Sequence, residues 1–311
     1  MKLHEVLATL GIKNTPEIWQ RHWEGAKASF KGTPFLEEVY IREANQLMNL
    51  SEERVNMLCE TAAFFKSTPE GQGFLWLWHY VLFHSGEEVT STYDWDVPEA
   101  LPQHLHAMPH ALILLGAIPA LQDYYNKKGI PTSVMVDTLR DVTVVMDEHR
   151  VMYGHCGVGN YRMWWMHNHF TGKIFWLGRL QYIYKPDDCL LDVHIPGYGP
   201  MSHKACTESY KQALEFYAKY FPEYEIKGFI CHSWLLSPHL KKILPPESNI
   251  IRFQSEYTIH KTLTEDRGIY EYIFKVPEGK ELPQDTSLQR AVKKLLDEGG
   301  HIGLGEGIRG I

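Results

Sequence analysis

A glycine-containing turn at Gly197, Tyr198 and Gly199 is the stretch whose residues could do chemistry, because a helix is predicted to follow it. Ser202 stands where a helix N-cap is expected, and the predicted helix runs from there to Phe221. The first backbone N–H groups of a helix have no partner within it, and such an end attracts anions. The spacing therefore permits a phosphate site, although most turns of this kind only join a strand to a helix.

His194 is the last polar residue of the predicted strand that leads into this turn. Asp192 and His194 fall on one face of that strand, and Leu191 and Val193 on the other. A ligand held by the turn would pass the imidazole of His194, which could take up a proton. The alternative is a histidine that only forms a hydrogen bond with a neighbouring strand.

Cys231, His232 and Ser233 form a second group of reactive side chains near the end of another predicted strand. Cys231 and Ser233 share one face, so they could serve a site or could only pack. The GxSxG motif of a hydrolase nucleophile elbow is absent from the sequence. Arg179 and Gln181 share a face of a further strand, where they could contact a substrate or be solvated.

Seventeen histidines raise the question of a metal site. His104, His106 and His110 are close in sequence, as are His167 and His169, and imidazole is a common ligand of zinc, copper and iron. The sequence contains no HExxH motif and no CxxC pair beside them. We therefore assign no metal ligands, and a metal-dependent enzyme is kept as a third hypothesis.

The composition excludes several classes of partner. The net charge is -7, and no run of lysine and arginine suggests a nucleic-acid groove. Five cysteines without a repeated spacing indicate free thiols in a reducing compartment, which favours the cytoplasm. The longest apolar run, residues 111–121, is shorter than the roughly 20 residues of a membrane helix, and Pro119 interrupts it. We expect a soluble cytoplasmic protein with no nucleic-acid or membrane partner.

The first half of the chain has the apolar spacing of helices throughout. Turn residues such as glycine and proline separate the predicted segments. These helices are predicted at 17–30, 35–50, 52–66, 74–84, 112–127 and 133–152. Three glycines within residues 154–159 indicate a linker. The sequence therefore predicts a helical N-terminal domain at 1–155 and a second domain at 156–311.

The second half changes to a mixed α and β pattern with a largely antiparallel sheet. An aromatic-rich hairpin is expected first, and a glycine-rich tail is expected at the end. A helix is also predicted at 287–296, after a short one at 238–244. The predicted strands are 162–170, 174–184, 189–195, 226–235, 249–262 and 269–276. The fold class is therefore α+β.

Five sequence runs resemble a bacterial family of GNAT-like acyltransferase-domain proteins that carry a helical domain in front. The resemblance extends from about Trp164 to the C-terminus, and the first half resembles the family only in general character. It implies a GNAT-like sheet, acetyl-CoA or another acyl-CoA as cofactor, and transfer of the acyl group to a small amine. The helical half would then cover the site or shape the acceptor pocket, and a homodimer is an open expectation. The runs are LGRLQY, LDVHIPGYGP, FICHSWLLSP, LPPESNIIRFQ and TSLQRA.

The resemblance also implies roles for particular residues. The pantetheine arm would lie where the strands at 190–195 and 226–235 part. His194 would act as the general base towards the acceptor amine, while Ser233, Cys231 and His232 would face the departing thiolate or orient the substrate. Arg179 and Gln181 are kept as candidate substrate-binding residues on the evidence of their shared strand face alone. The residues implied for cofactor binding are Ile195, Gly197, Tyr198, Gly199, Met201, Ser202 and His203.

The turn departs from the family pattern in two ways. The Gln or Arg that usually leads the loop is missing, and Pro200 has no N–H to donate. The tyrosine that often serves as general acid has several candidates, namely Tyr210, Tyr217, Tyr257 and Tyr270. A non-catalytic module that binds acyl-CoA for regulation is therefore the alternative to an N-acyltransferase.

Overall fold

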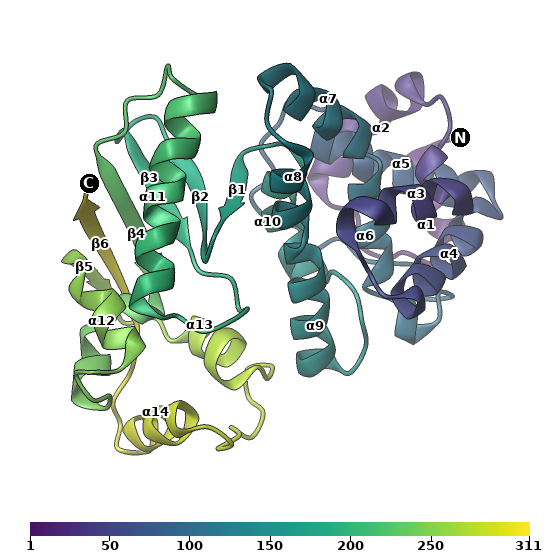
Figure 1. The fold of residues 1–311 in the computed structure, drawn as a ribbon. Coiled ribbons are helices and arrows are strands. Elements are labelled where there is room, and N and C mark those ends of the chain that lie inside the picture. Colours follow the sequence, from purple (N-terminus) through teal and green to yellow (C-terminus); the bar gives the residue numbers. More distant parts are fainter. The chain divides into compact units, whose positions relative to one another are not determined.

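The computed structural model describes residues 1–311 apart from the side chain of Arg267, and the chain divides into two compact units (Figure 1). The first unit contains residues 1–150 and 154–173. The second contains residues 151–153 and 174–311. The first is helical and the second holds a sheet, so each is described by itself.

The first unit consists of ten α-helices and two short 3-10 helices among its described residues. No helix in the described part of the chain is both long and apolar enough to cross a membrane. The helices are α1 (Leu3–Thr9), α2 (Glu17–Ser29), α3 (Glu38–Met48), α4 (Glu52–Lys66), α5 (Pro69–Phe83), α6 (Met108–Leu115), α7 (Ile118–Lys128), α8 (Thr132–Leu139), α9 (Asp141–Tyr153) and α10 (Asn160–Phe170), with the 3-10 helices η1 (Pro34–Leu36) and η2 (Gln103–Leu105).

Aromatic side chains form the centre of this helical unit. Trp19 of α2 meets Phe74 of α5 edge-on with ring centroids 5.4 Å apart, and Phe74 lies 4.9 Å from Trp78. Trp95, from the segment between α5 and α6, lies 5.4 Å from Trp78. All four side chains are fully buried. Side chains of this size account for much of the stability of a core.

The second unit is built on a six-stranded sheet with the order β1-β2-β3-β4-β6-β5. Only β3 and β4 pair in parallel, and the helix α11 connects them. Three further helices and three short helical turns follow β4. The elements are β1 (Ile174–Leu177), β2 (Leu180–Lys185), β3 (Leu190–His194), α11 (His203–Tyr220), β4 (Gly228–Ser233), η3 (Trp234–Leu236), η4 (Pro238–Lys242), α12 (Asn249–Ser255), β5 (Thr258–Leu263), α13 (Arg267–Ile269), the π-helix η5 (Tyr270–Phe274), α14 (Ser287–Asp297) and β6 (Leu304–Gly310).

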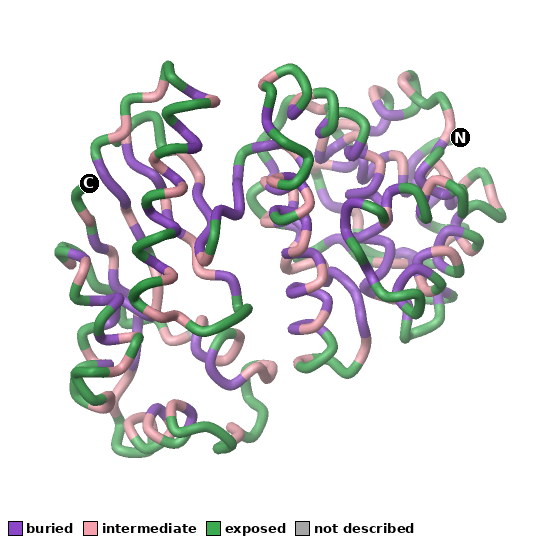
Figure 2. The backbone as a smooth tube through the Cα atoms, in the orientation of Figure 1, coloured by how far each residue is buried: buried purple, intermediate pink, exposed green. Residues whose placement is uncertain are grey.

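Helix α11 covers one face of this sheet, as Figure 1 shows. Phe175 of β1 lies 4.7 Å from Phe216 of α11, and Phe229 of β4 lies 4.8 Å from Tyr210. Figure 2 shows this pattern as buried stretches along β1 and β2 and along one side of α11. Because strand side chains alternate, the polar residues Asp192 and His194 must occupy the other face.

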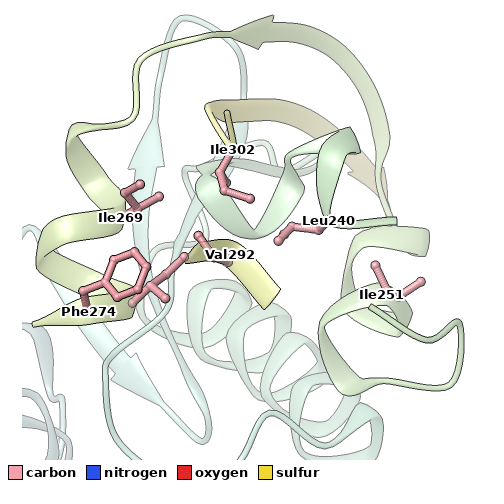
Figure 3. Close-up of a cluster of buried hydrophobic side chains, with 7 residues drawn as sticks. Leu240, Ile251, Ile269, Phe274, Val292 and Ile302 are labelled. Carbon is pink, nitrogen blue, oxygen red and sulfur yellow. The ribbon is translucent and has the colours of Figure 1, made fainter. Parts of the chain in front are cut away.

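A second, smaller core lies beside the sheet and is formed by short segments from η4 to Ile302, just before β6 (Figure 3). Seven apolar side chains are buried together there, and they stabilise helices that would be too short to persist alone. The members are Leu240, Ile251, Ile269, Ile273, Phe274, Val292 and Ile302.

The predicted fold class is confirmed, since a helical first half precedes a mixed, largely antiparallel sheet. The strand predicted at 162–170 is wrong. It is the helix α10, in which Met163, Met166 and Phe170 are buried at helical spacing. Aromatic content suggested a strand, but the three- and four-residue period decides the structure.

Three further predictions towards the C-terminus are also wrong. The strand predicted at 249–262 begins as the helix α12, and only its end belongs to β5. Residues 269–276 were expected as a strand but contain α13 and the π-helix η5. The glycine-rich tail is the strand β6, which pairs with both β4 and β5. A side chain at Gly305 would collide with the carbonyl oxygen of Leu236, so glycine there lets η3 pack directly on the strand.

Candidate active site

Strands β3 and β4 part at their carboxyl ends. Their pairing begins at Leu190 and Gly228 and ends at Asp192 and Ile230. Beyond that point β3 continues to His194, while β4 continues to Ser233 and pairs only with β6. Unpaired strand edges offer N–H and C=O groups to an extended ligand, so this opening can accept an amide-containing arm.

The loop after β3 leads from this opening to the N-terminus of α11. Ser202 is the N-cap, and its Oγ accepts a hydrogen bond of 3.2 Å from the backbone N–H of Ala205. In the described part of the chain, nothing accepts a hydrogen bond from the backbone N–H groups of Met201, His203 and Lys204. These groups therefore remain available to an anion at the positive end of the helix.

Gly199 gives this loop its turn. Its φ is +75°, in the left-handed region, and a Cβ built there would meet no atom within 4 Å. Backbone conformation and not crowding therefore favours glycine at this position. Tyr198 beside it is 56 % exposed and lies edge-on to Trp176 of β1, with ring centroids 6.4 Å apart.

His194 stands at the mouth of the opening beside a carboxylate. Its Nε2 lies 3.5 Å from Oδ2 of Asp192, and Lys185 Nζ lies 3.6 Å from the same oxygen. Burial would raise the pKa of Asp192, but the neighbouring imidazole of His194 and the charge of Lys185 outweigh it and lower the pKa. Asp192 is therefore an ionised side chain that can hold the imidazole in one orientation.

Gln181 lies directly opposite His194 in the pairing of β2 with β3. Trp176 of β1 lies opposite Gln181, so the three side chains form one row across the same sheet face. Gln181 is 2 % exposed in this row. The structure thus brings together Gln181 and His194, two residues that the sequence singled out separately.

The β4 residues occupy two different faces. Cys231 is fully buried on the face covered by α11, and burial raises the pKa of its thiol well above the usual value, with a further contribution from Asp192. The Oγ of Ser233 accepts a hydrogen bond of 3.2 Å from Leu235 N and caps η3. His232 is exposed on the face shared with His194. Of these three, His232 is the side chain that solvent reaches most freely.

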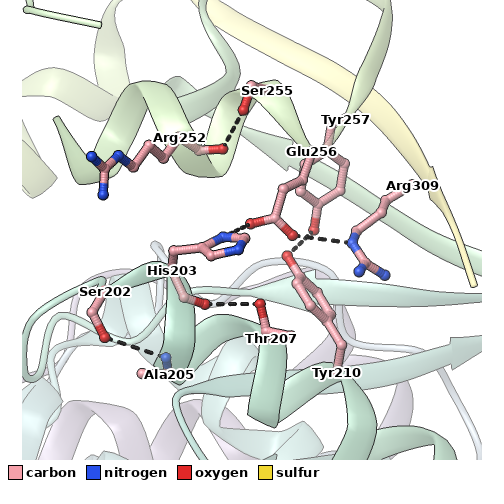
Figure 4. Close-up of polar contacts among 10 residues, drawn as sticks. All are labelled: Ser202, His203, Ala205, Thr207, Tyr210, Arg252, Ser255, Glu256, Tyr257 and Arg309. Atoms are coloured by element: carbon pink, nitrogen blue, oxygen red, sulfur yellow. Dashed lines mark hydrogen bonds and ion pairs between the residues drawn. The ribbon is translucent and has the colours of Figure 1, made fainter. Parts of the chain in front are cut away.

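A polar cluster ties the start of α11 to α12 and β6 (Figure 4). His203 Nδ1 lies 3.0 Å from Glu256 Oε1, and Arg309 Nε donates to Glu256 Oε2 at 3.2 Å. Below it, the hydroxyl groups of Tyr210 and Tyr257 form a buried hydrogen bond of 2.8 Å. Sequence reasoning missed Glu256 and Arg309, because contacts across 53 residues leave no local signal.

Three of the four tyrosines considered as general acids have hydrogen-bond partners within the protein. Burial raises the pKa of both Tyr210 and Tyr257, which are bonded to each other. Tyr217 donates to the carbonyl oxygen of Tyr182 at 3.2 Å. Sequence reasoning could have added Asp192 to the candidate site residues, since it lies two residues from His194 and therefore on the same strand face.

The histidine groups considered for metal binding lie in the helical unit. His106 contacts the carbonyl oxygen of Leu101 at 2.7 Å, and His169 lies 2.9 Å from the carboxylate of Asp141. His110 is fully buried. Among the residues that the structure describes, no group of three or more His, Cys, Asp or Glu is arranged to hold a metal ion.

The two units match two families of known domains. Residues 39–172 match the N-acyltransferase N-terminal domain, and residues 174–309 match the GNAT-like C-terminal domain. No protein of curated function is similar enough in sequence to count as a match.

Solved structures with a similar fold span this chain from end to end. A crystal structure of an acyltransferase in complex with decanoyl-CoA and teicoplanin is 25% identical, covers 100% of this chain and 99% of its own, and has a TM-score of 0.85. An acyltransferase in complex with CoA and 10C-teicoplanin has the same identity and coverage, with a TM-score of 0.84. An acyltransferase variant in complex with octanoyl-CoA is also 25% identical, covers 100% of both chains, and has a TM-score of 0.83.

Proposed function

Because this chain belongs to the GNAT-like acyltransferase family, with a helical N-acyltransferase domain in front, we propose that it transfers an acyl group from acyl-CoA to a small amine. The parting of β3 and β4 beside the N-terminus of α11, where the N–H groups of Met201, His203 and Lys204 have no acceptor among the described residues, carries the proposal. This arrangement offers strand edges to the pantetheine arm and backbone N–H groups to the diphosphate. The similar acyltransferases that hold CoA or its acyl thioesters support it.

The loop residues assigned to the cofactor keep that assignment in the proposal. Their backbone would follow the diphosphate, while the unbonded N–H groups at the start of α11 donate to its oxygens. Pro200 contributes no N–H, so the contacts depend on the residues after it. The assigned residues are Ile195, Gly197, Tyr198, Gly199, Met201, Ser202 and His203.

His194 acts as the general base in this proposal. The amine nitrogen of the acceptor attacks the thioester carbonyl carbon, a C–N bond forms, and the C–S bond breaks. The proton lost by the nitrogen passes to the imidazole of His194, directly or through water, and the sulfur leaves to become the CoA thiol after protonation. Asp192, 3.5 Å away, orients the imidazole and balances the positive charge that it gains. His232 is exposed on the same sheet face. It is the candidate for orienting the substrate or protonating the departing thiolate.

The acyl group in our proposal extends beyond acetyl. Acetyl-CoA was the first expectation from the sequence, whereas the similar acyltransferases were crystallised with octanoyl-CoA and decanoyl-CoA. A test must therefore cover several chain lengths. The similar proteins that also hold teicoplanin or 10C-teicoplanin make teicoplanin a reasonable addition to the acceptor panel.

Calorimetric titration with CoA, acetyl-CoA, octanoyl-CoA and decanoyl-CoA tests binding directly. We expect saturable heat with at least one thioester and release of free thiol when an amine acceptor is added. Folded protein that gives no heat with any of the four would contradict the proposal. Tight binding without thiol release across a broad amine panel would favour the regulatory module instead.

A further inference from the structure

Arg179 connects the turn between β1 and β2 to the loop after β3. Its Nε donates to the carbonyl oxygen of Pro200 and its Nη2 to that of Gly199, each at 3.2 Å. The same turn is attached to α11, because Ser209 Oγ accepts a hydrogen bond of 3.0 Å from the N–H of Leu180. The turn therefore holds both the loop and the helix that follows it.

The charge of Arg179 has no carboxylate partner among the described residues, although arginine remains protonated in proteins. Its Nη1 is buried and has no hydrogen-bond acceptor in the part of the chain that the structure describes. Burial lowers the pKa of its guanidinium from the usual value. A partly desolvated cation that contacts only neutral carbonyl groups favours an anion nearby.

Arg309 of β6 shows the contrast. It donates to Glu256 at 3.2 Å and its guanidinium lies 4.2 Å from the centre of the Tyr210 ring (Figure 4). Its charge is therefore neutralised within the protein. Of these two arginines, Arg179 is the one whose counter-charge is not supplied by the chain.

The hydrogen bonds of Arg179 also fix the direction of the loop peptides. In a trans peptide the C=O and N–H groups point in opposite directions. With the Pro200 carbonyl directed at Arg179, the N–H of Met201 points away from it. The negative ends of two carbonyl groups are thereby turned from the place where a diphosphate would bind.

We propose that Arg179 is the positioning residue of the diphosphate loop and supplies the positive charge that the loop's own sequence lacks. The inference rests on the proposed function, and it names the donor group that the site recognises as the diphosphate of CoA. Residues 195–202 contain no lysine or arginine, so the cation beside this loop comes from the β1–β2 turn. Arg179 acts through the carbonyl groups of the loop and through its charge, since Nη1 is enclosed by protein atoms.

A comparison of two acyl donors distinguishes positioning of the diphosphate loop by Arg179 from a general structural role of this residue. Acyl-CoA carries the diphosphate, and the same acyl group on pantetheine does not. We expect Arg179→Gln to raise the KM for acyl-CoA roughly 10-fold, with a smaller change in kcat, and to leave the KM for acylpantetheine unchanged. Arg179→Lys keeps the charge without the paired hydrogen bonds, so its KM should lie between wild type and Arg179→Gln.

Arg290 provides a matched control. Its Nη1 donates to the carbonyl oxygens of Gln284 and Asp285 at 2.8 and 3.1 Å, so it also holds a loop but is remote from α11 in the sequence. Arg290→Gln should leave the KM of both donors unchanged. Circular dichroism and the melting temperature establish that each variant is folded.

The outcomes distinguish the inference from the function on which it rests. An equal rise in KM for both donors, or no rise for either, would overturn the role of Arg179 while the transferase proposal stands. Calorimetric titration with CoA alone gives a readout independent of turnover, and we expect the same roughly 10-fold loss of affinity in Arg179→Gln. If wild-type protein binds CoA but uses neither donor, the transferase proposal fails and this binding comparison still decides the inference.

Discussion

Two histidines packed inside the helical unit differ in environment from three histidines of the sheet unit, although the residue type is the same. In the helical unit, burial lowers the pKa of His79 to about 4 and that of His110 to about 3. In the sheet unit, His194, His203 and His260 each lie within 3.5 Å of a carboxylate and remain partly open to solvent. The first group serves as neutral packing, whereas the second lies beside charged partners within reach of solvent.

Packing explains the difference. The His110 ring stacks on Trp78 with centroids 5.0 Å apart, and His79 lies among Phe35, Trp76 and Phe83. An apolar helix interface removes water from an imidazole and favours its neutral form. The face of the sheet opposite α11 leaves His194 beside Asp192 and the opening between β3 and β4. Histidine content alone therefore does not locate chemistry in this chain.

The largest effect should come from removing the sheet histidine at the opening. We expect His194→Gln to lower kcat about 10²- to 10⁴-fold, the range for loss of a general base, while the affinity for CoA stays near that of wild type. Thiol release gives kcat, and calorimetric titration gives the affinity.

His260→Gln is the control for this effect, since it changes an exposed histidine of the sheet unit that has no role in the proposed reaction. A loss of activity no larger in His194→Gln than in His260→Gln would show that the histidine beside Asp192 is not the general base. Asp192→Asn should give a smaller decrease in kcat than His194→Gln, because it removes the orienting partner and leaves the imidazole.

The second largest effect should be that of buried His110 on the free energy of unfolding at acidic pH. The folded pKa of His110, about 3, lies below its ordinary 6.5, so the unfolded chain binds more protons as the pH falls. The stabilisation of the folded state by neutral His110 is therefore fully present above pH 6.5, and it is lost as the pH falls towards 3. We expect His110→Phe to reduce the loss of unfolding free energy between pH 7 and pH 5 by about 2 kcal/mol.

Chemical unfolding followed by tryptophan fluorescence at both pH values measures this change. The difference between the two pH values is the quantity to compare, because a phenyl ring can also alter packing at any pH. His232→Gln, which changes an exposed histidine, serves as the control for stability. Its unfolding free energy should depend on pH as in wild type. The same pH dependence in His110→Phe as in wild type would show that the buried histidine does not stay neutral.

The smallest effect separates two histidines that are both paired with glutamate. His203 begins α11 and lies 3.0 Å from Glu256, while His260 on β5 lies 2.8 Å from Glu306. Only His203 is close to the proposed diphosphate loop, so His203→Gln should raise the KM for acyl-CoA roughly 2- to 5-fold. His260→Gln should leave it unchanged. Equal effects in the two variants would indicate that the glutamate pair, and not the helix end, determines the change.

Much of the architecture could be predicted from local patterns. The helix at Glu52–Lys66, the N-cap at Ser202 and the strand leading to His194 follow from apolar spacing and capping chemistry. The strand β6 at the C-terminus could not be predicted in this way. Its Gly305 is explained by the close contact with Leu236, and that contact forms only in the folded chain. The aromatic run at Asn160–Phe170 was also misread, since aromatic residues are common in strands and in buried helices alike.

The sequence by itself determined the alternation that puts Asp192 and His194 on one strand face and the cap that begins α11, because both depend on neighbours a few residues away. The tertiary structure alone decided which charges are neutralised. Glu256 and Arg309 are 53 residues apart, and Arg179 reaches its loop across 21 residues. Such contacts depend on how strands and helices pack together, and they cannot be predicted from the local periodicity of the sequence.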